Sequence, residues 1–107
     1  MHYKLRKAGI YTVIDWTGDV GMSIAPEARE PILQCLDDGQ HLLMELSKVS
    51  YIDSSGVAVL VEGHLTARKK ELSFGLVAPS RAVMNVLKLA RMEEIIPIHV
   101  SLKSLNS

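Results

Sequence analysis

A short polar run, Asp53-Ser54-Ser55-Gly56, carries the side chains of the sequence that are best suited to chemistry. A serine beside an aspartate suggests a hydrolase nucleophile, but such a serine needs a base within hydrogen-bond reach and usually a third group that orients the base. Asp53 is adjacent in sequence, where a turn would place it wrongly for a relay, and the run lacks the Gly-x-Ser-x-Gly pattern. The run therefore does not predict a nucleophilic serine.

The four histidines of the sequence are scattered, and none of them supplies the missing base. His64 follows Ser54 on the same predicted helix, but the intervening helix separates the two residues by about 15 Å. No pair of histidines or carboxylates has the spacing of metal ligands, and no glycine-rich phosphate loop is present. We therefore expect that the chain is not an enzyme and that it uses no metal and no cofactor. The remaining histidines are His2, His41 and His99.

The single cysteine, Cys35, cannot form a disulfide within the chain. Its neighbours in Ile32-Leu33-Gln34-Cys35-Leu36 indicate a core thiol on an amphipathic helix. Reactive thiols usually have a basic neighbour that lowers their pKa, and Cys35 has none in sequence. We interpret Cys35 as a structural side chain.

The charge balance argues against a nucleic-acid binder, and the lengths of the apolar segments argue against a membrane protein. Lys+Arg and Asp+Glu both count 12, so the formal net charge is zero, and no basic field of the kind that nucleic acid needs is present. The cationic run Arg68-Lys69-Lys70 falls at a predicted helix C-terminus, where cations favour the helix dipole. No window approaches the roughly 20 apolar residues of a membrane span, and the N-terminus lacks a signal-peptide segment. We expect a soluble, cytoplasmic protein without direct membrane insertion.

The hydrophobic period of the chain changes at the polar run. Before it, His41 to Val49 is apolar and rich in strand-forming residues, whereas from Val57 to Leu65 apolar residues recur at helical spacing. Asp and Ser accept hydrogen bonds from the first free N–H groups of a helix, and Gly permits a tight turn or a close approach of the backbone. The pattern predicts a strand that leads into a helix at Ser54 or Ser55, with a hydroxyl near the surface.

Strands and helices are predicted to alternate along the rest of the chain. A turn at Ala8-Gly9 favours an antiparallel hairpin at the start, and residues 17–21 are predicted as a loop. The predicted strands are His2 to Lys7, Ile10 to Trp16, His41 to Leu46, Leu72 to Ala78 and Glu94 to Val100; the predicted helices are Pro31 to Asp38, the one after Asp53, and Arg81 to Arg91 with Ser80 as its cap. The tail, Ser101 to Ser107, is expected to fray or to form one final turn.

Three prolines refine this prediction. Because proline is tolerated in the first turn of a helix but not in its interior, we expect a loose turn at Pro26 to Glu30 and a helix that begins at Pro31. Pro97 lacks a ladder donor, which places the last strand at a sheet edge. The 107 residues then form one α/β domain (residues 1–107), with a mixed sheet of an N-terminal hairpin plus parallel strands.

The run Ile52-Asp53-Ser54-Ser55-Gly56-Val57, with an apolar helix, a basic helix end and a strand after it, resembles the central motif of STAS domains. These are the small domains of bacterial anti-sigma-factor antagonists, which are also appended to sulfate transporters. The likeness extends over nearly all 107 residues in order of elements, and its specific part is Asp53 to Val57. It implies a sheet covered by about three to four helices, with the start of the central helix exposed at one end.

The resemblance also implies a function, because in antagonists of this family the first serine after the aspartate is phosphorylated. That position is Ser54 here, and Ser54 would otherwise be read only as part of a helix cap. The unphosphorylated protein would sequester an anti-sigma factor that is also a serine kinase, and a PP2C-type phosphatase would reverse the phosphorylation. The implied partner-binding residues are Asp53, Ser54, Ser55, Gly56 and Val57, together with Gly18, Asp19 and Gly21 of the loop Gly18 to Met22.

Two observations leave an alternative open. Many antagonists have a pattern like Gly-Glu-Leu-Asp in the first loop, whereas Gly18-Asp19-Val20-Gly21 lacks the second carboxylate. In addition, Glu62-Gly63 and the run Leu89 to Ile98 are similar to STAS subunits of ATP-driven lipid transporters. The alternative function is therefore a regulatory subunit that docks on an ABC transporter ATPase without being phosphorylated.

Overall fold

The computed structural model describes residues 2–103, which form one five-stranded sheet, three α-helices and a short 3-10 helix. The elements are β1 (His2–Ala8), β2 (Tyr11–Val20), α1 (Ala25–Asp37), β3 (His41–Ile52), α2 (Ser54–Lys69), β4 (Phe74–Val77), α3 (Arg81–Leu89), the 3-10 helix Met92–Glu94 and β5 (Ile98–His99). The strand order is β1-β2-β3-β4-β5, with β1 antiparallel to β2 and all other neighbours parallel. The predicted α/β class, the N-terminal hairpin and the mixed sheet are confirmed.

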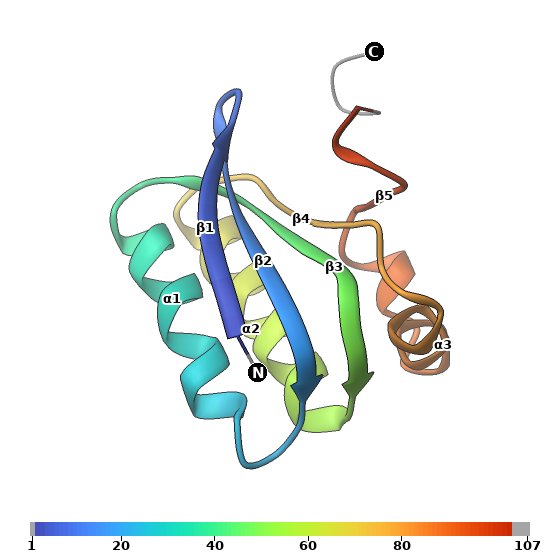
Figure 1. The fold of residues 1–107 in the computed structure, drawn as a ribbon. Helices are drawn as coiled ribbons and strands as arrows, with labels where there is room; N and C mark the ends of the chain where they lie inside the picture. Colours follow the sequence, from blue (N-terminus) through green and yellow to red (C-terminus); the bar gives the residue numbers. More distant parts are fainter. Residues whose placement is uncertain (1, 104–107) are drawn as a thin grey trace.

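Helices α1 and α2 lie side by side against one face of the sheet, and α3 lies beside β3 on the side away from β1 (Figure 1). The core between the sheet and the two helices contains fully buried side chains from each layer, for example Ile14, Met44, Leu36 and Leu60. A smaller cluster on the opposite face joins Val13, Leu43 and Val77, with Leu102 packed against it. The sheet is therefore thickly covered on the face that carries α1 and α2.

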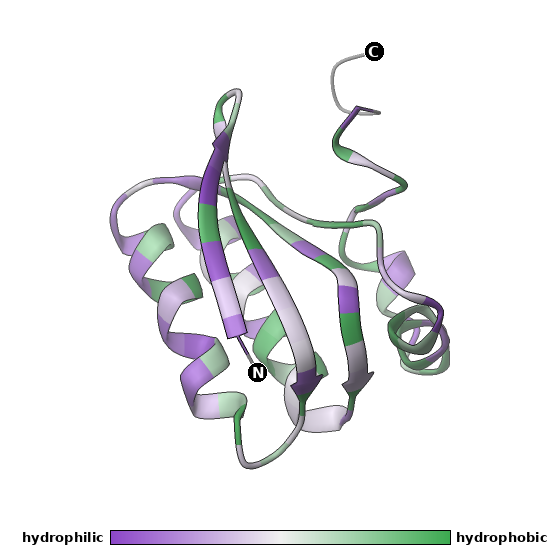
Figure 2. Cartoon of the chain, viewed as in Figure 1, coloured by the Kyte–Doolittle hydropathy of each residue, from purple (hydrophilic) through white to green (hydrophobic). Residues whose placement is uncertain are grey.

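The two edges of the sheet are polar or short. Strand β1 is coloured mostly as hydrophilic in Figure 2 and carries Lys4, Arg6 and Lys7, which discourage a further strand from pairing with it. At the other edge, β5 is confirmed as the edge strand and follows Pro97 directly. Within residues 2–103, no helix has the length and apolar character that crossing a membrane requires.

Strand β2 is longer than predicted, because residues 17–20 continue the strand instead of forming a loop. The register runs on to the pair Val20 and Ile52, with a shift between Gly18 and Asp19 that marks a bulge. Gly18 has a φ of +94°, which glycine adopts without strain. Gly18, which had suggested a loop, is therefore the residue that permits an irregular strand. Strand β3 also continues beyond its predicted end, as far as Ile52.

Helix α1 begins at Ala25, so the predicted loose turn at Pro26 to Glu30 is wrong. Pro26 lies in the first turn, where its missing N–H group costs nothing, and Pro31 lies inside the helix. Pro31 is buried with Ile32 on the face toward the core. Burial of this face offsets the one backbone hydrogen bond that Pro31 cannot donate.

The C-terminal third differs from the prediction in the lengths of its elements. Strand β4 is four residues long, and the predicted strand from Glu94 to Val100 contains only the two residues of β5. The 3-10 helix Met92–Glu94 takes up Glu94, and residues 95–97 form a turn before β5. Ser80 caps α3 as predicted, since its Oγ accepts a hydrogen bond from the N–H of Val83 at 3.3 Å. The predicted final turn lies partly outside the described residues, which end at residue 103.

Candidate functional site

Asp53 caps α2 and also holds the loop that follows β2. Its Oδ1 accepts hydrogen bonds from the N–H groups of Ser55 at 2.9 Å and Gly56 at 3.2 Å, and its Oδ2 accepts one from the N–H of Met22 at 3.1 Å. Both carboxylate oxygens are therefore engaged by backbone donors. One side chain fixes two segments that are far apart in sequence.

Ser54 is the first residue of α2, and its side chain is exposed, while Ser55 is half-buried. The predicted helix start with a hydroxyl at the surface is therefore confirmed. The ends of β2 and β3 and the start of α2 lie at the same end of the domain (Figure 1). A macromolecule that docks at this end can reach the Ser54 hydroxyl without any change in the fold.

Gly56 brings α2 unusually close to the sheet. A Cβ atom at this position would lie 2.6 Å from the carbonyl oxygen of Val20 and 2.6 Å from Cγ1 of Ile52. Its φ is not positive, so glycine is needed here for close approach and not for a left-handed turn. The next residue, Val57, was predicted to contact a partner, but its side chain is 7% exposed and belongs mainly to the core.

The other predicted partner-binding residues lie at the same end of the sheet. Asp19 is on β2, where its Oδ1 accepts a hydrogen bond from the Ser50 hydroxyl at 2.7 Å. Gly21 follows β2, and a Cβ atom there would lie 3.2 Å from Oδ2 of Asp53. A depression of about 450 Å³ joins this region to the helix cap; it is lined by Asp19, Gly21, Met22, Ser23, Ile24, Tyr51 and Asp53.

Two exposed side chains lie in this depression: Met22, the last residue of the loop that was predicted to contact a partner, and Tyr51, which sequence reasoning missed. Met22 is 76% exposed and Tyr51 is 51% exposed. Methionine and tyrosine are enriched in protein interfaces, because both offer a large contact area that still tolerates water. The alternation of β3 could have indicated Tyr51, since its neighbour Ile52 faces the core.

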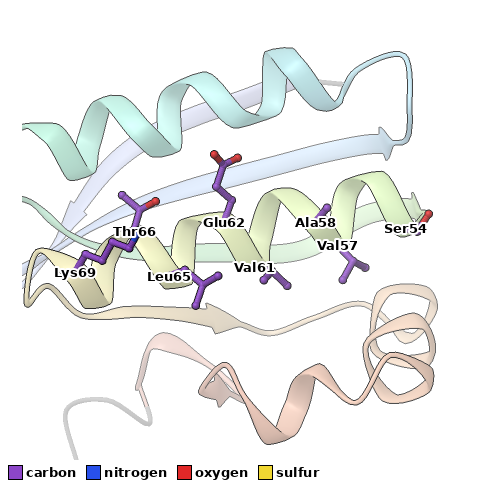
Figure 3. Close-up of a pocket in the computed structure, with 8 residues that line it drawn as sticks. All are labelled: Ser54, Val57, Ala58, Val61, Glu62, Leu65, Thr66 and Lys69. Carbon is purple, nitrogen blue, oxygen red and sulfur yellow. The ribbon is translucent and has the colours of Figure 1, made fainter.

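A groove of about 600 Å³ runs along the outer face of α2 and begins at Ser54. Figure 3 shows Val57, Val61 and Leu65 on one side of this face and Ala58, Glu62 and Thr66 on the side toward α1. The groove is lined by Ser54, Val57, Ala58, Val61, Glu62, Leu65, Thr66 and Lys69. The apolar residues of α2 recur at helical spacing as predicted, but they do not all lie in the core, because Leu65 is 52% exposed.

Glu62 and Gly63 have structural contacts that explain their presence. Glu62 accepts two hydrogen bonds from the Arg29 guanidinium, at 2.5 and 2.8 Å, and this pairing lowers the pKa of Glu62. A Cβ atom at Gly63 would lie 2.8 Å from the Phe74 ring. The two residues thus hold α2 against α1 and the sheet.

The remaining candidate residues lie away from the helix cap. His64 is 8% exposed beside the Phe74 ring, and burial lowers its pKa. Cys35 is buried in α1 as predicted, and burial raises the pKa of its thiol. Among residues 2–103, no cluster of three His, Cys, Asp or Glu side chains could hold a metal ion.

Replacing Asp53 with alanine is expected to lower the free energy of unfolding by about 1 to 2 kcal/mol, because the N–H groups of Ser55, Gly56 and Met22 lose their acceptor. Urea denaturation measures the change. Asp19→Ala is the matched control, since Asp19 accepts only from an exposed hydroxyl and should change the stability by less than about 0.5 kcal/mol. Equal effects of the two substitutions would contradict the bridging role of Asp53.

Comparisons with known proteins agree on the family and the fold. The family model of the STAS domain matches residues 4–105. No curated protein sequence matches the chain. Each structure below is less than 25% identical to the chain, so its likeness to the chain is a likeness of fold alone.

Three solved structures illustrate the likeness. A protein from Thermotoga maritima has a TM-score of 0.88 and 20% identity, covering 96% of this chain and 90% of its own. An anti-sigma factor antagonist from Mycobacterium paratuberculosis has a TM-score of 0.84 and 24% identity, covering 96% and 88%. The Bacillus cell fate determinant SpoIIAA in its phosphorylated form has a TM-score of 0.74 and 16% identity, covering 98% and 97%.

Proposed function

The chain belongs to the STAS domain family, and from this premise we propose that it is a bacterial anti-sigma-factor antagonist switched by phosphorylation of Ser54. In the unphosphorylated state it binds and sequesters an anti-sigma factor that is also a serine kinase. The kinase inactivates its antagonist by phosphorylating Ser54, and a PP2C-type phosphatase restores binding. The protein acts in the cytoplasm through protein contacts alone and is not itself an enzyme.

The exposed position of Ser54 at the first residue of α2 is the observation that carries the proposal. A kinase must reach the hydroxyl, and the domain must keep its fold after modification. The exposure of Ser54 supports the first condition, and the second is supported by the helix cap, which Asp53 and not Ser54 provides. The phosphate would therefore be added to a side chain that the fold does not use.

The surroundings of Ser54 suit a protein partner. Exposed Met22 and Tyr51 lie in the depression beside the helix cap, and the apolar groove on α2 begins at Ser54 itself. A partner that covers this end of the domain would bury apolar area around a central hydroxyl. A phosphate at that position must then lose its water when the partner binds, at a cost of several kcal/mol unless a cation meets it.

Labelling with the cognate kinase and ATP tests the proposal. Wild-type protein is expected to gain one phosphate per chain, Ser54→Ala none, and the control Ser55→Ala one, because Ser55 is half-buried. Intact mass and phosphopeptide mapping measure the result. Labelling that persists in Ser54→Ala, or that Ser55→Ala removes, would show that the site is wrong.

Docking on an ABC transporter ATPase remains the alternative prediction. Its residue signature is weakened by the structural contacts of Glu62 and Gly63, which any STAS domain with this helix packing could need. Purification of tagged protein from its native cells separates the two functions. Recovery of a permease and its ATPase, with Ser54 unmodified, would favour the alternative.

A further inference from the structure

The two edges of the sheet are protected in different ways. Strand β5 has only two residues and follows Pro97, and both features hinder any strand that could pair with it. Strand β1 is seven residues long, contains no proline and pairs with β2 in an unbroken register over its whole length. Among residues 2–103, no strand pairs with the outer side of β1, so its outward backbone N–H and C=O groups are available to a further strand (Figure 1). Only side chains protect this edge.

Two of the three cations on β1 are held by side chains of β2. Arg6 donates hydrogen bonds to both carboxylate oxygens of Asp15, at 2.7 and 3.1 Å. Lys7 donates one to the Thr12 hydroxyl at 2.9 Å. Lys4 is exposed and shares a face with Arg6, because side chains two residues apart point to the same side of a strand. The charge that an incoming strand meets at the middle of β1 is therefore mainly that of Lys4.

The other face of β1 presents apolar side chains. Tyr3 is 46% exposed and Leu5 is 53% exposed. Their partners on β2 are Trp16 and Ile14, which belong to the core beneath the helices. Because paired residues of neighbouring strands share a face, Tyr3 and Leu5 lie at the open margin of that core. A strand added to β1 would cover both side chains and extend the core face of the sheet.

A second copy of β1 does not suit this edge. Antiparallel strands set residues of the same face opposite each other, and like charges in opposite positions are destabilising. Every antiparallel register of two β1 strands that overlaps at least five residues sets Lys4 against Lys4, Lys4 against Arg6, or Arg6 against Arg6. The charges therefore discourage most strands, a second copy included, and select a strand of opposite charge.

The outer face of the sheet beside Lys4 has room for acidic side chains. A hollow of about 570 Å³ lies there, and the Lys, Arg, Asp and Glu residues that line it are Lys4, Arg6, Lys48, Asp15 and Glu45. Arg6 and Asp15 neutralise each other, so that two lysines remain against one glutamate. An acidic side chain opposite Lys4 would point into this positive region.

We propose that β1 is the docking edge for an extended segment of a partner protein in which acidic and apolar residues alternate. Backbone hydrogen bonds to β1 supply the affinity, and the two sets of side chains supply the specificity. The acidic residues face Lys4 and the hollow, while the apolar residues cover Tyr3 and Leu5. This contact takes no part in the switch proposed for Ser54.

Fluorescence anisotropy with a labelled peptide, acetyl-Thr-Glu-Val-Glu-Val-Glu-Thr-amide, tests the proposal. Wild-type protein is expected to bind it about tenfold more tightly than the counterpart with lysine in place of each glutamate. The same peptide N-methylated at each glutamate and valine has lost its backbone donors and should not bind. Failure of the wild-type protein to bind the glutamate peptide, or equal binding of the N-methylated form, would overturn the proposal.

Two substitutions distinguish the strand edge from the hollow. Lys4→Glu is expected to weaken binding of the glutamate peptide about tenfold and to strengthen binding of the lysine peptide by a similar factor. Lys48→Glu is the matched control, because Lys48 lines the same hollow but lies on β3, two strands from the edge. At about 150 mM salt it should change either affinity by less than about twofold. Equal effects of the two substitutions would place the peptide in the hollow and overturn strand addition.

Amide hydrogen exchange, followed by NMR, provides a measurement that needs no substitution. At saturating concentration the glutamate peptide should slow exchange about tenfold at alternate residues of β1, whose N–H groups point outward, and should leave β5 at the other edge unchanged. Slower exchange at β5, or no change at β1, would overturn the proposal. Neither measurement involves Ser54, so the kinase labelling of Ser54 remains a separate result.

Discussion

Gly56→Ala is expected to lower the free energy of unfolding by about 2 to 3 kcal/mol, or the melting temperature by roughly 10 to 20 °C. The new Cβ would lie 2.6 Å from the backbone oxygen of Val20 and 2.6 Å from Cγ1 of Ile52. Alanine has a better helix propensity than glycine by about 1 kcal/mol, but the clash outweighs this gain. Urea denaturation followed by circular dichroism measures the change.

Two further variants separate steric clash from other causes. Ser55→Ala lies in the same turn, with its backbone hydrogen bond to Asp53 intact, and should change the stability by less than about 0.5 kcal/mol. Ile52→Ala in the Gly56→Ala background removes the side-chain clash but leaves the one with the Val20 carbonyl, so it should not restore stability. A Gly56→Ala protein as stable as wild type would show that α2 does not approach the sheet this closely.

Gly56 matters for function because it sets the position of Ser54. Moving α2 outward to make room for a Cβ atom would shift the helix start relative to the ends of β2 and β3. Asp53 could not then hold both the helix start and Met22 with the present hydrogen bonds. We conclude that the close approach at Gly56 and the bridge at Asp53 together fix the shape of the candidate docking surface.

The features that the sequence predicted correctly depend on local chemistry. Asp53 followed by small polar residues predicted a capped helix, and the change of hydrophobic period predicted where β3 ends and α2 begins. Pro97 predicted an edge strand, because a missing donor has the same consequence in any sheet. Such signals need no knowledge of the rest of the fold.

The features that the sequence could not predict depend on tertiary packing. Pro31 stands inside α1 because the burial of its helix face offsets a local cost. Gly18 permits a bulge instead of ending β2, since β3 continues beside it as far as Ile52. The exposed Leu65 recurs at helical spacing with the other apolar residues of α2, so periodicity alone cannot distinguish the inner face of this helix from its outer face.

Phosphorylation of Ser54 is expected to weaken the complex with the anti-sigma factor by at least a hundredfold while changing the stability of the domain itself by less than about 1 kcal/mol. The phosphate adds about −1.5 to −2 charges at a helix start that carries about +0.5. The free N–H groups and the helix dipole stabilise part of this negative charge, whereas the neighbouring Asp53 carboxylate repels it. We therefore expect the stability of the domain to change little on phosphorylation and its affinity for the partner to fall.

The magnitude of this effect decides whether one phosphate is sufficient for a switch. Shifting a complex from 99% to 1% bound requires about 5.5 kcal/mol, and burying an uncompensated phosphate costs several kcal/mol. Titration calorimetry with the partner and thermal denaturation of both forms measure the two effects separately. Ser73→Glu is the control, because it adds a charge at an exposed residue before β4, on the opposite end of the sheet, and should leave the affinity unchanged. If phosphorylation instead unfolded the domain, the switch would act by destroying the fold of the antagonist and not by placing a charge on its docking surface.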